Sequence, residues 1–85
     1  MRVKLDRPAR PHWACEEHHV FNGTANRKHS EKYNCVVYIP SAFHREIHRN
    51  AELRKQLKAE YQAKLEEAGW TREEFISTFG RSYVD

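Results

Sequence analysis

The sequence lacks long hydrophobic runs and contains only two cysteines among its 85 residues. It has no stretch of about 18 apolar residues, so we expect no membrane-spanning helix. The first residues carry charges and lack the apolar segment of a secretory signal peptide. Cys15 and Cys35 fit a reducing compartment better than a disulfide framework, although one bridge between them stays open as an alternative. Together these features predict a cytoplasmic protein with no membrane partner.

Positive charge is moderate and lies in the first half of the chain. The formal net charge is +3, and the mean hydropathy of −0.97 indicates a polar chain. Residues 1–40 carry seven Lys and Arg against four Asp and Glu, whereas residues 41–85 carry eight of each kind. A basic N-terminal half can attract nucleic acid, but an excess of this size is weak evidence alone. A chain this short supports one small domain, which often needs a metal or a partner for stability.

Histidine is absent from the last 37 residues, and all six histidines lie within the first 48. His44 and His48 are four residues apart in a predicted helix, where side chains at this spacing share one face and can reach one metal ion. His18 and His19 are adjacent at a predicted strand end, where neighbours face opposite sides. One of them can therefore bind a metal while the other stays free as a base. Each pair alone also suits ordinary surface residues.

The order of predicted elements is strand, loop, strand, short helix, long helix and short helix. They cover residues 13–17, 24–33, 35–39, 42–49, 51–68 and 71–79. The loop is polar and has room for one or two helical turns. Pro40 ends the second strand and Ser41 is the expected N-cap of the short helix. Thr71 and Glu74 form a capping box that predicts the start of the last helix.

The predicted core combines aromatic and aliphatic side chains from several elements. Trp13, Phe43 and Ile47 are expected to form its N-terminal part. Apolar residues recur every four positions along the long helix, at Leu53, Leu57, Tyr61 and Leu65. This stripe is expected to pack into the core, because a short chain needs that area buried. A dimer face is the alternative.

The sequence of these motifs resembles the ββα-metal motif of the HNH endonuclease family. His18-His19-Val20 resembles the family's His-His-Ile segment, and residues 37–48 (VYIPSAFHREIH) resemble its second strand and helix. The resemblance covers about residues 13–50 and is closest in character to small phage-encoded members. It implies a single α+β domain over residues 1–85. That domain would consist of a basic arm (1–11), an HNH-like ββα-metal hairpin with its short helix (12–50), and a long helix followed by a short one (51–85).

The resemblance implies a role for each of four histidines. His18, His44 and His48 would bind one divalent metal ion (Mg²⁺, Mn²⁺, Ni²⁺ or Zn²⁺), and three imidazoles leave positions open for a phosphate. His19 would be the general base that removes a proton from the attacking water. The ion would stabilise charge on the phosphate and the leaving oxygen. The implied activity is that of a DNA endonuclease or nickase in the cytoplasm of a bacterial host.

The resemblance also implies contacts with DNA and a loop-positioning asparagine. Candidates for contact with the DNA backbone are Arg27, Lys28, Lys32 and Arg45. Each of these basic residues also suits a solvated surface. The family's middle asparagine falls at Cys35, so Asn34, one position earlier, is the candidate that positions the loop bearing the base.

The absence of Cys-x-x-Cys pairs departs from many HNH proteins, so we expect no structural zinc. A non-cleaving, phage-encoded HNH-like binding protein is therefore an alternative to the nuclease. It would bind a protein partner of phage or host, as an inhibitor of a host defence nuclease such as CRISPR, or act as an accessory factor in DNA packaging or recombination. A third possibility is a zinc domain whose histidines only hold the fold.

Overall fold

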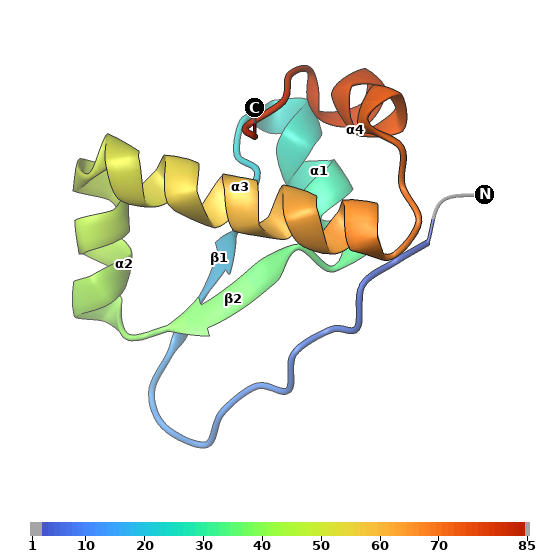
Figure 1. Cartoon of the computed structure of the whole chain (residues 1–85). Coiled ribbons are helices and arrows are strands. Elements are labelled where there is room, and N and C mark those ends of the chain that lie inside the picture. The colour runs from blue at the N-terminus through green and yellow to red at the C-terminus, as the bar shows by residue number, and fades with distance from the viewer. Residues whose placement is uncertain (1–2, 85) are drawn as a thin grey trace.

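Two short antiparallel strands, β1 (Glu16–His19) and β2 (Val36–Ile39), form the only sheet within residues 3–84, the part of the chain that this computed structural model describes (Figure 1). Their register pairs His18 with Val37 and His19 with Val36. With four helices around this sheet, the chain has a small α+β fold. The predicted first strand is displaced, because β1 begins three residues later than Trp13 and runs through the His-His pair.

The connection between the strands is a ten-residue helix, α1 (Thr24–Tyr33), which is longer than the one or two turns expected. Gly23 begins it with a φ of 98°, a value that favours glycine. Buried Ser30 anchors the helix to the strand end, since its hydroxyl accepts from the Phe21 amide at 3.0 Å and donates to the Phe21 carbonyl at 2.8 Å. Ser30, a polar residue near the end of α1, thus supplies hydrogen bonds to the backbone amide and carbonyl of a residue that follows β1.

Three further helices follow β2: α2 (Ser41–Arg49), α3 (Ala51–Glu67) and α4 (Arg72–Phe79). The predicted capping box of the last helix is confirmed, with both reciprocal hydrogen bonds between Thr71 and Glu74 present. The prediction of Ser41 as an N-cap is wrong. Pro40 occupies that position, and the Ser41 hydroxyl instead donates to the Glu16 carboxylate at 2.9 Å.

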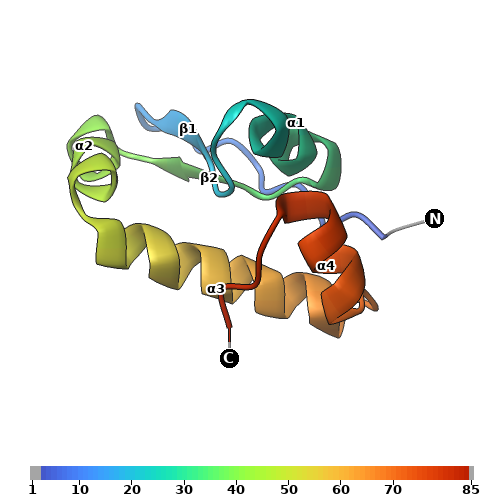
Figure 2. The ribbon, with the colours of Figure 1, turned by 90° about the horizontal axis from the view of Figure 1, so that it is seen from above.

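The core lies where α1, α3 and α4 meet the ends of the two strands. Figure 2 shows α3 running along one side of the hairpin, with α2 at one end of α3 and α4 near the other. The buried residues of this cluster are Val20, Phe21, Tyr33, Cys35, Leu65, Trp70, Phe75 and Phe79. The predicted stripe on α3 contributes to this core, because Leu65 is fully buried and Leu57 and Tyr61 pack against the cluster.

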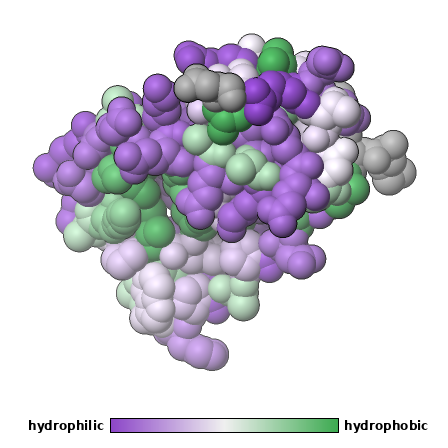
Figure 3. All heavy atoms as spheres, in the orientation of Figure 1, coloured by the Kyte–Doolittle hydropathy of each residue, from purple (hydrophilic) through white to green (hydrophobic). Residues whose placement is uncertain are grey.

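Two of the three aromatic and aliphatic residues predicted for the N-terminal core are exposed. Ile47 is buried, but Trp13 is 51% exposed and Phe43 is 41% exposed. Trp13 precedes β1 and therefore has no sheet face to cover. Phe43 lies on the rim of a groove of about 180 Å³ between α2 and α3. Figure 3 shows hydrophobic atoms gathered over this part of the molecule.

The predicted N-terminal arm is extended and hydrogen-bonded to the body of the protein. The Trp70 indole donates to the Val3 carbonyl at 2.8 Å, and the side-chain amide of Asn34 donates to the Leu5 carbonyl at 2.8 Å. The Leu5 amide donates to the Tyr33 carbonyl at 3.1 Å. Residues 1 and 2 of the arm, and Asp85 at the other end, lie outside the described residues.

Cys15 and Cys35 are both free thiols, so the bridge that the sequence left open is absent. Burial raises the pKa of the Cys35 thiol to about 12, which keeps it protonated. Across residues 3–84, no helix combines the length and the apolar composition needed to cross a membrane.

Candidate metal centre

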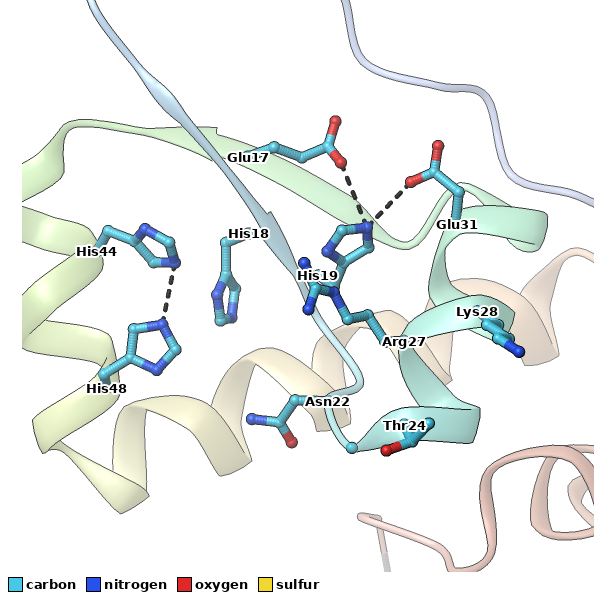
Figure 4. Close-up of a pocket in the computed structure, with 11 residues that line it drawn as sticks. Glu17, His18, His19, Asn22, Thr24, Arg27, Lys28, Glu31, His44 and His48 are labelled. Carbon is cyan, nitrogen blue, oxygen red and sulfur yellow. Dashed lines mark hydrogen bonds and ion pairs between the residues drawn. The ribbon is translucent and has the colours of Figure 1, made fainter.

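The structure brings His18 of β1 together with His44 and His48 of α2 (Figure 4). One ring nitrogen from each residue lies within 4.8 Å of the other two. The His18 ring centroid is 5.2 Å from that of His44 and 5.6 Å from that of His48. The Nε2 atoms of His44 and His48 are 3.1 Å apart. Three imidazoles from two distant segments therefore converge on one point.

Local backbone geometry explains this convergence. Alternation along β1 directs Glu16 and His18 to one face, and Glu17 and His19 to the other. Only Pro40 separates β2 from α2, so the helix begins beside the first residue of β1. The spacing of four residues then places both α2 imidazoles on the helix face that looks toward His18.

Burial decreases across the triad. His18 is 4% exposed, His44 is partly buried and His48 is exposed. Desolvation, followed by the neighbouring His44 and His48 rings, lowers the pKa of His18 to about 4. At neutral pH His18 is therefore an uncharged imidazole, which is the protonation state that binds metal.

Glu16 orients the second imidazole of the triad. Its Oε1 accepts a hydrogen bond from His44 Nδ1 at 2.7 Å, and this bond is the main cause of the lowered pKa of Glu16. Neutral His44 consequently keeps its lone pair on Nε2, toward the triad. His48 Nε2 then carries the hydrogen between the two rings, and binding of an ion would shift it to Nδ1. The donor set and its orienting carboxylate fit a divalent ion with positions left for other ligands.

His19 belongs to a second group on the other face of β1. Its Nε2 lies 3.0 Å from Glu31 Oε2 and 3.3 Å from Glu17 Oε1 (Figure 4). Carboxylates only accept, so Nε2 of His19 carries the hydrogen and Nδ1 is the unprotonated nitrogen of the neutral ring. The guanidinium of Arg7 contacts the same two carboxylates, at 2.7 Å for Glu17 and 3.0 Å for Glu31.

Both histidine groups border one open pocket of about 900 Å³. The turn before α1 (Asn22 and Gly23) lines its other side together with Thr24, Arg27 and Lys28 of the helix. These two of the four predicted DNA-contacting residues therefore lie beside the histidines. Lys32 instead places its ammonium 5.4 Å from the centre of the Tyr33 ring, and Arg45 is exposed on α2 without lining the pocket.

Asn34 ends α1 in a left-handed conformation with a φ of 62°. Its side chain binds the N-terminal arm through the Leu5 carbonyl, and its Oδ1 lies 3.4 Å from the Arg7 guanidinium. It therefore contacts the residue that pairs with the carboxylates around His19 and makes no direct contact with the turn before α1 among the described hydrogen bonds.

Sequence reasoning missed the charged partners of the histidines, namely Arg7, Glu16, Glu17 and Glu31. A signal for two of them was present. Strand alternation in Glu16-Glu17-His18-His19 places each carboxylate on the face of one histidine. Arg7 and Glu31 had no such signal, because their positions depend on how the arm and α1 pack.

Acidification is expected to destabilise the metal-free protein through His18. Its folded pKa of about 4 lies below the ordinary value of 6.5, so the unfolded chain binds the proton more readily. The contribution of neutral His18 is complete above pH 6.5 and is lost as the pH falls toward 4. Between pH 6.5 and 4.5 the loss should reach about 2–3 kcal/mol of unfolding free energy.

Urea unfolding in the presence of a chelator would measure this loss. The lowered pKa values of Glu16 and Glu31 keep these two carboxylates charged in the folded protein over this pH range. The His18→Gln variant should show a flatter profile over the same range. An equally steep profile for this variant would assign the titration to another group.

Comparison with protein-family models, with curated proteins and with solved structures finds no match to this chain.

Proposed function

We propose that the protein is a divalent-metal-dependent DNA endonuclease or nickase with an HNH-like ββα-metal centre. The observation that carries this proposal is the meeting of His18 with His44 and His48 while the next residue, His19, borders the same pocket outside the triad. A metal-binding group beside an unligated imidazole can supply the Lewis acid and the general base for phosphodiester hydrolysis.

In this proposal, His18, His44 and His48 hold the ion. The bound ion supplies Lewis-acid stabilisation of the charge that develops on the phosphate and on the leaving oxygen. His19 accepts the proton of the attacking water at Nδ1, because Nε2 is occupied by hydrogen bonding to carboxylates. Glu16 keeps His44 in the tautomer that binds metal through Nε2.

Arg27 and Lys28 are the residues that we propose for contact with the DNA backbone. Both line the pocket that the histidines border, and cationic side chains neutralise phosphates without regard to base sequence. Arg45 is exposed next to His44 on α2, and neither Arg45 nor Lys32 lines the pocket. With DNA as the substrate, the protein would act in the cytoplasm of a bacterial host.

Plasmid nicking tests the proposal. Supercoiled plasmid incubated with the protein and Mg²⁺, Mn²⁺, Ni²⁺ or Zn²⁺ should be converted to open-circular or linear DNA with at least one of these ions. A His44→Ala/His48→Ala double variant should lose the activity, because one imidazole alone binds a divalent ion weakly. His12→Ala is the matched control, since His12 is an exposed histidine that does not line the pocket.

Metal binding without cleavage by the wild-type protein would reject catalysis. Retention of DNA affinity would then favour the non-cleaving HNH-like binding protein. Loss of DNA affinity together with a large metal-dependent rise in melting temperature would favour the zinc domain whose histidines only hold the fold.

A further inference from the structure

Arg7, in the N-terminal arm, closes a hydrogen-bonded network around His19. Each of the two carboxylates divides its oxygens between Arg7 and His19. Oε2 of Glu17 and Oε1 of Glu31 contact the guanidinium, at 2.7 and 3.0 Å. Oε1 of Glu17 and Oε2 of Glu31 lie 3.3 and 3.0 Å from His19 Nε2. The network joins the arm, β1 and α1, three segments that are separate in the sequence.

Glu17, His19 and Glu31 could together hold a cation if Arg7 were absent. The donor atoms of Glu17, His19 and Glu31 lie within 4.8 Å of one another. Two carboxylates and an imidazole make a ligand set that divalent ions accept. An ion in this group would bind Nε2 of His19 in place of its hydrogen, which would move to Nδ1, and would remove the hydrogen bonds that orient the ring.

We propose that Arg7 is a positioning residue for the base, acting as a fixed internal cation on Glu17 and Glu31. It satisfies the two carboxylates, so that they hold the Nε2 hydrogen of His19 and do not recruit a second metal ion. His19 therefore stays unligated beside the histidine triad, with Nδ1 available. The inference rests on the proposed function for the catalytic meaning of His19, but the network and its metal selectivity can be measured without DNA.

Anchoring of the arm does not depend on Arg7. Backbone carbonyls of Val3 and Leu5 accept hydrogen bonds from Trp70 and Asn34, and the Leu5 amide donates to the Tyr33 carbonyl. Exposed ion pairs contribute little to stability. An Arg7→Ala variant should therefore keep its fold and its arm while it loses the cation between the two carboxylates.

Three variants test the inference. Arg7→Ala should raise the Zn²⁺ stoichiometry in calorimetric titration from one to two ions per chain. It should also change the ring ¹⁵N signals of His19, which in the wild-type protein at pH 8 report hydrogen on Nε2. Glu31→Gln removes one carboxylate, so it should disturb the His19 signals and stay at one ion. Either variant should lower kcat for plasmid nicking about 10- to 100-fold with little change in KM.

Arg10→Ala is the matched control in the same arm. Arg10 contacts the Cys15 carbonyl and lies over the Tyr38 ring, and none of the described ion pairs joins it to Glu17 or Glu31. This variant should keep one ion, the wild-type His19 signals and full activity. One ion and unchanged His19 signals in folded Arg7→Ala would overturn the inference, whatever the nicking activity. Inactive wild-type protein with the expected metal and ring signals would instead reject the nuclease while retaining the network.

Discussion

Under the proposed nuclease function, replacing His19 with alanine is expected to lower kcat for plasmid nicking about 100- to 10,000-fold, the range typical of a lost general base. Metal affinity should stay close to the wild-type value, because the three imidazoles of His18, His44 and His48 do not include His19. Stability should also change little, since the side chain lies at the pocket border and Arg7 still pairs with both carboxylates. Single-turnover nicking with saturating metal would measure the loss.

Chemical rescue by imidazole distinguishes a lost base from a lost metal ligand. Added imidazole should restore part of the activity of His19→Ala, because it can enter the space left by the side chain and accept the proton from water. It should have no such effect on the His44→Ala/His48→Ala variant, in which the metal ligands are missing. Unreduced activity of His19→Ala would show that another group activates water, and loss of metal binding would show that His19 is a ligand.

Replacing Phe21 with alanine is expected to remove about 3–5 kcal/mol of unfolding free energy. The Phe21 side chain is fully buried, and its ring centroid lies 4.2 Å from that of Phe79 and 5.3 Å from that of Phe75. A domain of this size has a total stability of about 4–13 kcal/mol. The cavity should therefore remove a large part of it, and urea unfolding followed by circular dichroism would measure the change.

Ile76→Ala is the matched control for the core. Ile76 follows Phe75 on α4 but is 40% exposed, so its truncation should cost less than about 1.5 kcal/mol. Similar losses for the two variants would mean that the buried cluster containing Phe21, Phe75 and Phe79 is not the principal core. Because Phe21 lies three residues after His18, a member of the histidine triad, partial unfolding of Phe21→Ala should also weaken metal binding.

Local signals in the sequence predicted several elements correctly. The capping box at Thr71 and Glu74 depends on residues three apart, and both of its hydrogen bonds are present. The repeat that ends at Leu65 predicted the buried face of α3, because a period near four residues follows from helix geometry. The spacing of His44 and His48 predicted two imidazoles on one face, and the structure places them there.

Features that depend on tertiary packing were not predictable in the same way. The exposure of Trp13 follows from where β1 begins, and β-pairing fixes that start through a partner strand twenty residues away. Serine is a residue type favoured at helix N-caps, yet the Ser41 hydroxyl contacts Glu16 of β1. The position of Arg7 depends on the path of an arm that has no periodic pattern. In each case the deciding contact comes from a distant part of the chain.

The three imidazoles of the triad are unevenly spaced in the sequence, and this spacing has a consequence for folding. His44 and His48 are adjacent as soon as one turn of α2 forms, whereas His18 comes from 26 residues earlier and arrives only when β1 pairs with β2. An ion held by all three would therefore favour the closed hairpin over open chains through thermodynamic linkage. At a free-ion concentration one hundred times the Kd, this linkage amounts to about 2.7 kcal/mol. The folded fraction of so small a domain would then follow the metal supply of its surroundings.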